Sequence, residues 1–482
     1  MSVAYYLGIV ALLCLIYVVC YRVFLSPLAK IPGPVITRFT GGWLLYQELT
    51  RRRRLYVHEL HKRYGPVVRI APDEVSFATG EAAKQIYSVG GSGFEKTEFY
   101  DLFMNFGARN MFSTLTKSEH SERKRRMADR YAKKYVMQSG VLSGIEERAR
   151  MFVKKVLQEC AAQKCVNVYV PLHCYALDGI THHLFHPFGT HAVEDDEDLK
   201  MMQELSYHDS LKSRVIQHRY PRLHSLLSNL ANPFRATKKP DRASAYVLEN
   251  CTTAKAAAVA DHTVLSKLQA RKDTVPILEM ASECMDHLVA GIDTTGDGLC
   301  FLLWQLSRPE SGAIQDKLRA ELLRNPATPV DELPYLEAVV KEGLRCYSPI
   351  PMSLPRRVPD GGRVLEGYFL PAWTTVSCQA FTLHQLDTEV FPRPGEFIPE
   401  RWLEQDRREE RNKLFFAFAS GGRGCIGRNL ALMEMKILLK EVYCTYRTTL
   451  SPDMTASMEI SDQIIASRPK DQVCLLQFQE IA

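Results

Sequence analysis

The sequence lacks the features by which nucleic-acid-binding proteins are recognised. Its 482 residues carry a mild formal net charge of +6, and no basic helix, zinc knuckle or aromatic platform stands out. Internal repeats and low-complexity tracts are absent too. With 46% hydrophobic and 24% charged residues, the composition is that of a globular protein. Nucleic acid is therefore not expected as a partner.

A disulfide framework is also missing. The thirteen cysteines are an odd number and follow no repeating spacing. Such usage fits reduced, mostly buried thiols in a protein that faces the cytosol. A cysteine with a chemical role must therefore be found from its neighbours.

Charge is absent from one long stretch near the N-terminus. No residue from Val3 to Tyr21 is charged, and about 20 apolar residues are what a helix needs to span a bilayer. A secretory signal peptide is the alternative, but no basic region precedes the run and no small-residue cleavage site follows it. Almost no acidic residues accompany the basic ones that come next, which are Arg22, Lys30, Arg38 and Arg51 to Arg54. The positive-inside rule then keeps the rest of the chain in the cytosol.

These observations predict three parts along the chain. Residues 1–24 form a single-pass transmembrane anchor, and residues 25–40 form a proline-rich linker. Pro27, Pro32 and Pro34 make the linker stiff and extended, so that it lifts the globular part clear of the membrane. Residues 41–482 form one globular domain.

Hydrophobic periodicity indicates a mainly α-helical domain with small β-sheets at its edges. Residues 140–160, 240–325 and 335–346 carry helix formers with apolar spacing of three and four. "YGPVVRIAPDEVSFAT" predicts two short strands around a Pro-Asp turn. Strand patterns return at 354–380 and at "QVCLLQFQE" near the C-terminus.

Three other stretches invite a functional interpretation but favour a structural one. "GGSGFEK" at 90–96 lacks the Gly-Lys-Ser/Thr ending of a phosphate loop, so a plain loop is expected. The acidic run from Glu194 to Asp198 suits a solvated loop or a helix start. A third stretch is rich in possible metal ligands without the spacing or acid partner of a zinc motif: His173, Cys174, His182, His183, His186 and His191.

The chemistry concentrates in "FAFASGGRGCIGRNLA", where four glycines and two arginines surround Cys425. Glycine lets a backbone bend tightly and approach another object, and arginine stays charged. A thiolate serves as a nucleophile, a zinc ligand or a haem ligand. Neither an oriented base nor partner zinc ligands are visible nearby. The stretch is suited to holding something flat and negatively charged against a sulfur.

The spacing of this stretch resembles the haem-binding loop of the cytochrome P450 family. Phe418 stands seven residues before the cysteine, Gly421 four before, Arg423 two before and Gly427 two after. The resemblance implies haem b, with the Cys425 thiolate as the axial ligand of its iron. It also implies that the glycines turn backbone amides toward the sulfur, that Phe418 shields the sulfur, and that Arg423 pairs with a propionate.

Two further motifs stand in the order that this family has. "AGIDTT", residues 290–295, resembles the oxygen-activating segment, which implies that Asp293 and Thr294 supply protons to dioxygen. Alone, such a pair would indicate a solvent-facing helical turn. "EGLR" and "PERW" resemble the segments whose Glu342, Arg345 and Arg401 form a buried network that supports the haem loop.

The propionate partners are less clear from the resemblance. Where the family often carries Trp with Arg four residues later, "HSERKRR" offers His120 and Lys124. Arg356, in "LPRRVP", is the other candidate, although the adjacent Arg357 can exchange roles with it.

The resemblance covers nearly the whole chain and is closest to membrane-bound fungal members. It implies a haem-thiolate monooxygenase in the endoplasmic reticulum membrane that oxidises an apolar small molecule of fungal secondary metabolism. Electrons would come from NADPH through a separate diflavin reductase, because the chain has no flavin or nicotinamide fingerprint. A haem-thiolate isomerase or dehydratase that does not use dioxygen, and a non-catalytic haem sensor, remain as alternatives.

The resemblance also indicates which segments line the substrate pocket. They are Phe103 to Phe112, residues 200–235, Met285 to Ala290, Ile350 to Leu354 and Ile464 to Ala466.

Overall fold

The structure is a computed structural model that describes residues 3–88, 93–206, 211–231, 241–271 and 275–481. Most of these residues lie in helices, and four small sheets accompany them. The mainly helical fold class expected from the sequence is therefore confirmed. The expected loop at 90–96 lies partly outside the described residues, and its last two residues form strand β3 (Glu95–Lys96).

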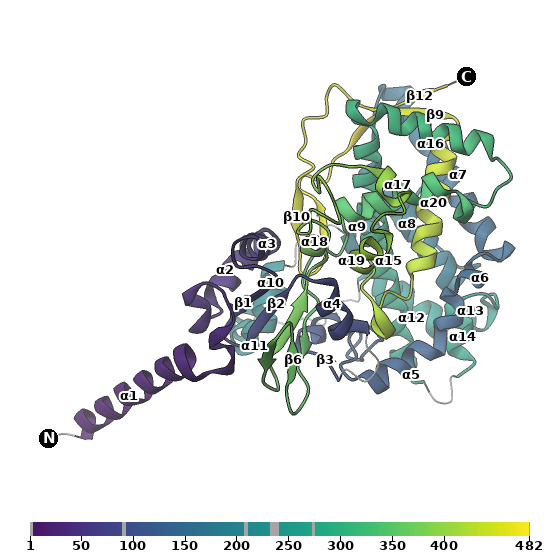
Figure 1. Cartoon of the computed structure of the whole chain (residues 1–482). Coiled ribbons are helices and arrows are strands. Elements are labelled where there is room, and N and C mark those ends of the chain that lie inside the picture. The colour runs from purple at the N-terminus through teal and green to yellow at the C-terminus, as the bar shows by residue number, and fades with distance from the viewer. Residues whose placement is uncertain (1–2, 89–92, 207–210, 232–240, 272–274, 482) are drawn as a thin grey trace.

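One long helix, α15 (Ile277–Leu306), runs through the centre of the body (Figure 1). Helices α8 (Tyr169–Phe185), α17 (Pro334–Cys346) and α20 (Arg428–Tyr443) pack against it, and α7 (Ser139–Gln163) packs against α8 and α20. Helix α8 is buried almost all round, as a helix without a polar face must be. It approaches α15 closely at two glycines, because a Cβ atom on Gly291 or Gly296 would lie 2.8 Å from Ile180 or His173.

The other helices form the periphery of the body. Their bounds are α2 (Gly42–Leu49), α3 (Arg53–Tyr64), α4 (Gly80–Ala83), α5 (Lys117–Met127), α6 (Lys133–Val136), α9 (Asp196–Ser206), α10 (Leu211–Arg219), α11 (Pro221–Ala231), α12 (Arg242–Thr252), α13 (Ala254–Ala258), α14 (Val264–Gln269), α16 (Gly312–Arg324), α18 (Ala380–Leu383) and α19 (Arg408–Leu414). The acidic run at 194–198 leads into the start of α9, in agreement with the sequence.

The largest sheet lies between the helical body and the N-terminal helix (Figure 1). Its strand order is β1 (Val67–Ala71), β2 (Glu74–Phe77), β8 (Thr375–Cys378), β5 (Arg356–Arg357) and β3. The smaller sheets pair β4 (Val166–Asn167) and β9 (Tyr446–Leu450) with β12 (Leu475–Glu480), β6 (Arg363–Leu365) with β7 (Tyr368–Leu370), and β10 (Ile460–Asp462) with β11 (Ser467–Pro469). Strands thus form at the places that the sequence predicts.

Register in the largest sheet decides which side chains reach the interior. Strands β3 and β5 are antiparallel, with Lys96 opposite Arg356 and Glu95 opposite Arg357. Directly opposed residues share a face of a sheet, and successive residues alternate between faces. Lys96 and Arg356 are accordingly buried together, whereas Arg357 is turned toward Glu98, with which it forms an ion pair.

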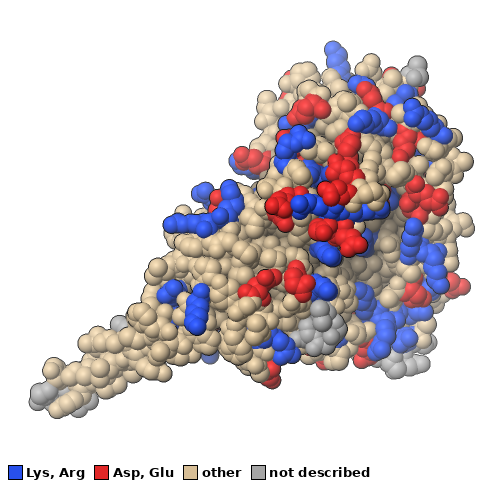
Figure 2. Space-filling model, in the orientation of Figure 1, with Lys and Arg blue, Asp and Glu red and all other residues tan. Residues whose placement is uncertain are grey.

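The N-terminal helix α1 (Val3–Cys20) projects from the body and continues as a π-helical turn (Tyr21–Leu25). Its described apolar side chains are exposed, and no charged side chain interrupts it (Figure 2). The segment from Tyr5 to Leu25 is long and apolar enough to cross a membrane. These properties are compatible with the expected anchor.

The linker differs from the extended spacer expected from its prolines. Residues 27–30 and 35–38 form two 3₁₀ turns, and Leu28 and Ile31 are buried. The Arg69 amide in β1 donates to the Pro32 carbonyl at 2.8 Å. Apolar side chains between the prolines therefore attach this segment to the largest sheet instead of leaving it as a free spacer.

We expect deletion of residues 1–24 to release a protein that still folds and binds haem, because these residues lie outside the buried core. The Arg22 guanidinium, which donates to the Phe39 carbonyl at 3.2 Å, is one exposed contact that the deletion removes. Membrane fractionation with an alkaline carbonate wash measures the result. A truncated protein that stays integral to the membrane would show that another segment is the anchor.

Candidate functional site

An internal cavity of about 480 Å³ lies between α15 and the cysteine loop, within the size range of small-molecule sites. Residues from all five segments expected to form the pocket line it, including Phe103, Leu211, Val289, Ile350 and Ile464. In the segment 200–235, residues 207–210 and 232–235 lie outside the described residues. The cavity therefore brings the chemical motifs and the predicted pocket segments to one place.

The cysteine loop is a compact turn closed by its own backbone. The Cys425 amide donates to the Phe418 carbonyl at 2.9 Å, and the Gly424 amide donates to the Gly421 carbonyl at 3.0 Å. Gly421 has φ +70°, and a Cβ atom there would lie 2.1 Å from the Tyr87 carbonyl oxygen. Only glycine fits at such a point. Gly421 thus serves the packing of the loop against the Tyr87 backbone and does not itself line the cavity.

Cys425 lies on the cavity wall, and the space to which it is exposed is the cavity. Helix α20 begins at Arg428, directly after Gly427, so its amides lie beside the sulfur. Burial raises the pKa of the Cys425 thiol, while the amides of Gly427 and Arg428 and the charges of Lys124 and Arg428 oppose that rise. A helix N-terminus and amide donors both stabilise a thiolate.

The segment "AGIDTT" borders the same cavity from α15. Ala290, Asp293 and Thr294 all line it, since residues three and four apart share a helix face. The Thr294 hydroxyl donates to the Ala290 carbonyl at 2.6 Å, which leaves its oxygen lone pairs available to the cavity. Burial, reinforced by Asp297, raises the pKa of Asp293 to about 6. The carboxyl can therefore hold or release a proton near neutral pH.

A group of basic side chains gathers beside the cysteine loop. Arg356, Arg423 and His120 line the cavity, and Lys124 lies behind the loop, where its Nζ donates to the carbonyls of Gly422 at 2.9 Å and Gly424 at 3.1 Å. The sequence did not indicate Lys96, which lies opposite Arg356 in the sheet and lines the cavity as well. Lys96 could be recognised only from the register between β3 and β5, which a single sequence does not reveal.

These basic side chains have few acidic partners within the described part of the chain. Arg423 forms an ion pair with Glu95, but its Nη1 atom and the His120 Nδ1 atom are buried without a hydrogen-bond partner among the described residues. Burial and the charges of Arg356 and Arg423 lower the pKa of Lys96 well below its ordinary value. Burial and the charge of Lys96 lower the pKa of His120 to about 2. The unpartnered nitrogens of Arg423 and His120 leave room in this group for an anionic ligand.

The donor set therefore fits haem. Its two propionates would supply negative charge to the cations, its iron would accept the Cys425 sulfur, and its apolar ring would border Phe418 and Ala290 in the cavity. The geometry selects Arg356 for this group and leaves Arg357 outside, where its guanidinium stacks 4.7 Å from the Trp373 ring.

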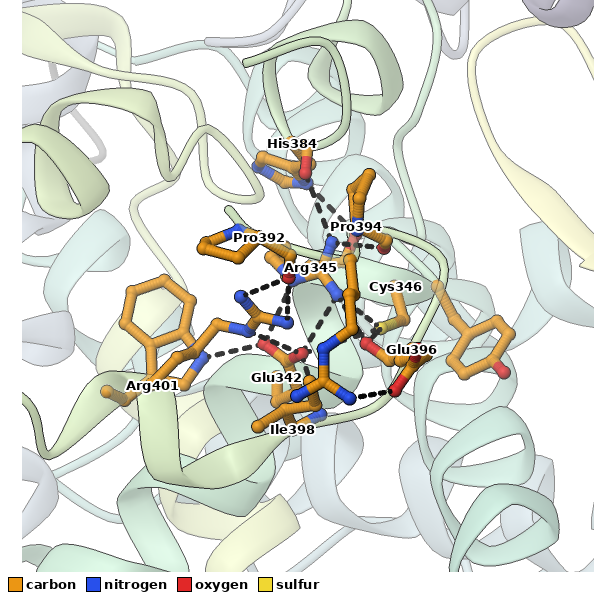
Figure 3. A network of polar contacts seen from close by, with 12 residues as sticks. Glu342, Arg345, Cys346, His384, Pro392, Pro394, Glu396, Ile398 and Arg401 are labelled. Atoms are coloured by element: carbon orange, nitrogen blue, oxygen red, sulfur yellow. Dashed lines mark hydrogen bonds and ion pairs between the residues drawn. The ribbon is translucent and has the colours of Figure 1, made fainter. Parts of the chain in front are cut away.

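Behind the loop, Glu342 is the centre of a buried network (Figure 3). Its carboxylate accepts from Arg345 at 2.8 and 2.9 Å, from Arg401 Nε at 3.0 Å, from Trp402 Nε1 at 2.9 Å and from the Ile398 amide at 3.0 Å. Two arginines and two neutral donors compensate one charge that is fully removed from water. The three residues that the sequence grouped are thus brought together.

His384 connects this network to the cysteine loop. Its Nδ1 donates to the Arg345 carbonyl at 3.2 Å, and its Nε2 accepts the Phe416 amide at 2.8 Å. Burial and the charge of Arg345 lower the pKa of His384 to about 3, so the ring stays neutral and can accept. Phe416 opens the loop that carries Cys425, and the network therefore determines where that loop starts.

The histidines considered as metal ligands lie in or after α8, and none of them is among the residues that line the cavity. Within the described residues, no three ligating side chains converge on a common point. Among these histidines, His173 packs against α15 beside the cavity.

Comparison with known proteins identifies the family. Residues 31–475 match the family model of cytochrome P450. The cytochrome P450 monooxygenase tazI of Aspergillus terreus is 28% identical, over 97% of this chain and 97% of its own length. The cytochrome P450 monooxygenase stcB of Emericella nidulans is 30% identical, over 94% of this chain and 89% of its own length. The benzoate 4-monooxygenase bphA of Aspergillus niger is 28% identical, over 91% of this chain and 90% of its own length. The chain belongs to the cytochrome P450 family, and is thus a haem-binding oxidoreductase.

We expect Cys425→Ala to abolish the thiolate-type spectrum of the reduced, carbon-monoxide-bound protein and all turnover, because the described cavity wall holds no other cysteine. Cys444→Ala, at the far end of α20, is the matched control and leaves both unchanged. An unaltered spectrum in Cys425→Ala would mean that another side chain ligates the iron.

Glu342→Gln is expected to lower the free energy of unfolding by about 3 to 5 kcal/mol, since it leaves Arg345 and Arg401 buried without their counter-charge. Glu59→Gln removes an exposed partner of Lys62 and should cost at most about 1 kcal/mol. Chemical denaturation of the haem-bound protein measures both. Equal losses would show that the network does not support the fold.

Proposed function

We propose that this member of the cytochrome P450 family is a monooxygenase that inserts one oxygen atom of dioxygen into an apolar small molecule. The observation that carries the proposal is that Cys425 and the pair Asp293 and Thr294 line one cavity. A sulfur ligand without a proton source would suit other haem chemistry. A proton source beside a thiolate-ligated iron suits the reductive cleavage of dioxygen.

The overall reaction consumes protons, which the chain must deliver. In balance, RH + O2 + NADPH + H⁺ gives ROH + H2O + NADP⁺. When bound, haem supplies the electron transfer and the oxygen chemistry. The chain's own residues hold the Cys425 thiolate, bind the propionates through the cations, and place the Asp293 carboxyl and the Thr294 hydroxyl where a proton is needed.

Asp293 and Thr294 divide the proton transfer between them in this proposal. With its pKa raised to about 6 by burial, Asp293 can take a proton from solvent and give it up again. Thr294 has its hydroxyl hydrogen on the Ala290 carbonyl, and rotation of that hydroxyl would present the hydrogen to the cavity instead. The same pair weighs against an isomerase or a sensor, neither of which needs protons delivered.

The cavity walls support an apolar substrate. The segments expected to form the substrate pocket contribute apolar side chains to the cavity wall, among them Phe103, Val289, Ile350, Leu354 and Ile465. Apolar walls favour apolar ligands. The benzoate 4-monooxygenase among the relatives acts, by its name, on an aromatic acid. We infer a small apolar molecule of fungal secondary metabolism as the substrate class.

The remaining parts of the proposal concern the surroundings of the enzyme. We propose that residues 1–24 anchor it in the endoplasmic reticulum membrane, which the exposed apolar helix α1 supports. A separate diflavin reductase would bring the two electrons of NADPH, and the exposed Arg428, which directly follows the haem loop, suits an acidic partner.

Replacement of Thr294 tests the proposal. Thr294→Ala should keep the carbon-monoxide spectrum and still oxidise NADPH with reductase, but release about tenfold more hydrogen peroxide per NADPH, because a positioned proton donor is lost. Thr252→Ala is the matched control, since the Thr252 hydroxyl donates to a helical carbonyl at the same distance, 2.6 Å, but in α12. Peroxide and NADPH are measured together. An unchanged ratio in Thr294→Ala would remove this residue from the reaction and favour the isomerase.

A further inference from the structure

A buried histidine and a buried aspartate meet beside the proposed proton donor. His173 of α8 and Asp297 of α15 are 0% and 3% exposed, and the His173 Nε2 atom lies 3.5 Å from the Asp297 Oδ1 atom. Asp297 follows Asp293 by one helical turn and lines the cavity with it. The ring of His173 fits there because Gly296 has no side chain.

Hydrogen bonding determines where the protons of this pair are. The His173 Nδ1 atom lies 2.8 Å from the Tyr169 carbonyl oxygen, which only accepts, so Nδ1 carries a hydrogen. Neither His173 Nε2 nor Asp297 Oδ1 has another hydrogen-bond partner in the described residues. Two lone pairs facing each other in the interior would be costly. One proton held by the pair, as an imidazolium or as a carboxylic acid, would remove that cost.

The surrounding charges support this state of the pair. Burial alone would lower the pKa of His173, but the carboxylates of Asp297 and Asp293 reverse that effect and raise it above the ordinary value. The groups that face the pair are Asp293 and Cys300 from α15, Tyr169 from α8 and Arg468 from β11. Among these four groups Arg468 is the permanent cation, and its charge lowers the pKa of Asp293.

We propose that His173 and Asp297 hold one shared proton behind Asp293 and return it to the Asp293 carboxyl after Asp293 has given its own proton to the cavity. The inference rests on the proposed monooxygenase function. The proton leaves His173 Nε2 through Asp297 Oδ1 to a carboxylate oxygen of Asp293, and no electrons move. The pair changes from neutral to a single negative charge, and water in the cavity reprotonates it. Both are positioning residues, because they act through Asp293.

Two variants separate a proton reserve from simple electrostatics. Asp297→Asn removes a charge that raises the pKa of Asp293, whereas His173→Gln removes a charge that lowers it. If electrostatics alone acted, the pH at which peroxide release rises would therefore fall in Asp297→Asn and increase in His173→Gln. If the variants instead lose a proton reserve, this pH is lower in both of them, because Asp293 is then reprotonated only by water.

The measurement is hydrogen peroxide released per NADPH, with fungal diflavin reductase and no added substrate, across the pH range. We expect about two- to tenfold more peroxide than the parent at mildly alkaline pH in both variants. His61→Gln is the control, because this buried ring also has one nitrogen on a backbone carbonyl, at 2.9 Å, but its partner is the Ser76 hydroxyl. Opposite shifts, or no shift, would overturn the proposal.

A spectroscopic arm does not depend on turnover. In the diamagnetic, reduced and carbon-monoxide-bound holoenzyme, ¹⁵N-histidine resonances report the imidazolium of His173, and infrared absorption reports a protonated Asp297. One of these two signatures should be present at neutral pH and vanish in Asp297→Asn. If neither is present, no shared proton exists. If the signature is present but the parent oxidises no NADPH, the proposed function fails and the shared proton stands.

Discussion

The position of the Cys425 loop depends on one buried carboxylate, that of Glu342. Two arginines, an indole and a backbone amide satisfy its oxygens, so the cost of removing these charges from water is offset only while all partners stay in place. Arg345 extends the network to the carbonyls of Pro394 and Glu396, and His384 extends it to the Phe416 amide. Segments far apart in the chain are thereby joined, and the cysteine loop begins where this network ends.

A second constraint is the excess of positive charge that the fold buries on the other side of the loop. Lys96 and Arg356 stand opposite each other in the sheet, and Arg423 and His120 retain unpartnered nitrogens in the described interior. The protein accepts like charges in proximity, at a cost in stability. A dianionic cofactor bound at this place would remove that cost and thereby stabilise the fold.

The motifs could be predicted from the sequence because each is local: a loop around Cys425, one helix face with Asp293 and Thr294, and one helical turn with Glu342 and Arg345. What could not be predicted depends on distant pairing. Lys96 becomes a cavity residue only through the β3–β5 register, and His173 reaches Asp297 only because α8 and α15 approach each other at Gly296. The expectation of an extended linker was wrong for a related reason. The prolines suggested stiffness, but the burial of Leu28 and Ile31 against the sheet decided the conformation.

Helix α15 combines two requirements that oppose each other. As the central helix it must bury its surface, and residues such as Leu299, Leu302 and Leu303 are fully buried. Toward the cavity it nevertheless presents the carboxyls of Asp293 and Asp297, which cost free energy in a dry interior. His173 and Arg468 reduce that cost without neutralising Asp293, whose pKa remains raised to about 6. A carboxyl fully paired with a cation would be stable but would hold no proton at neutral pH, and a carboxyl with no cation nearby would not release one. Partial compensation of this kind is what the proposed role of Asp293 in repeated proton transfer requires.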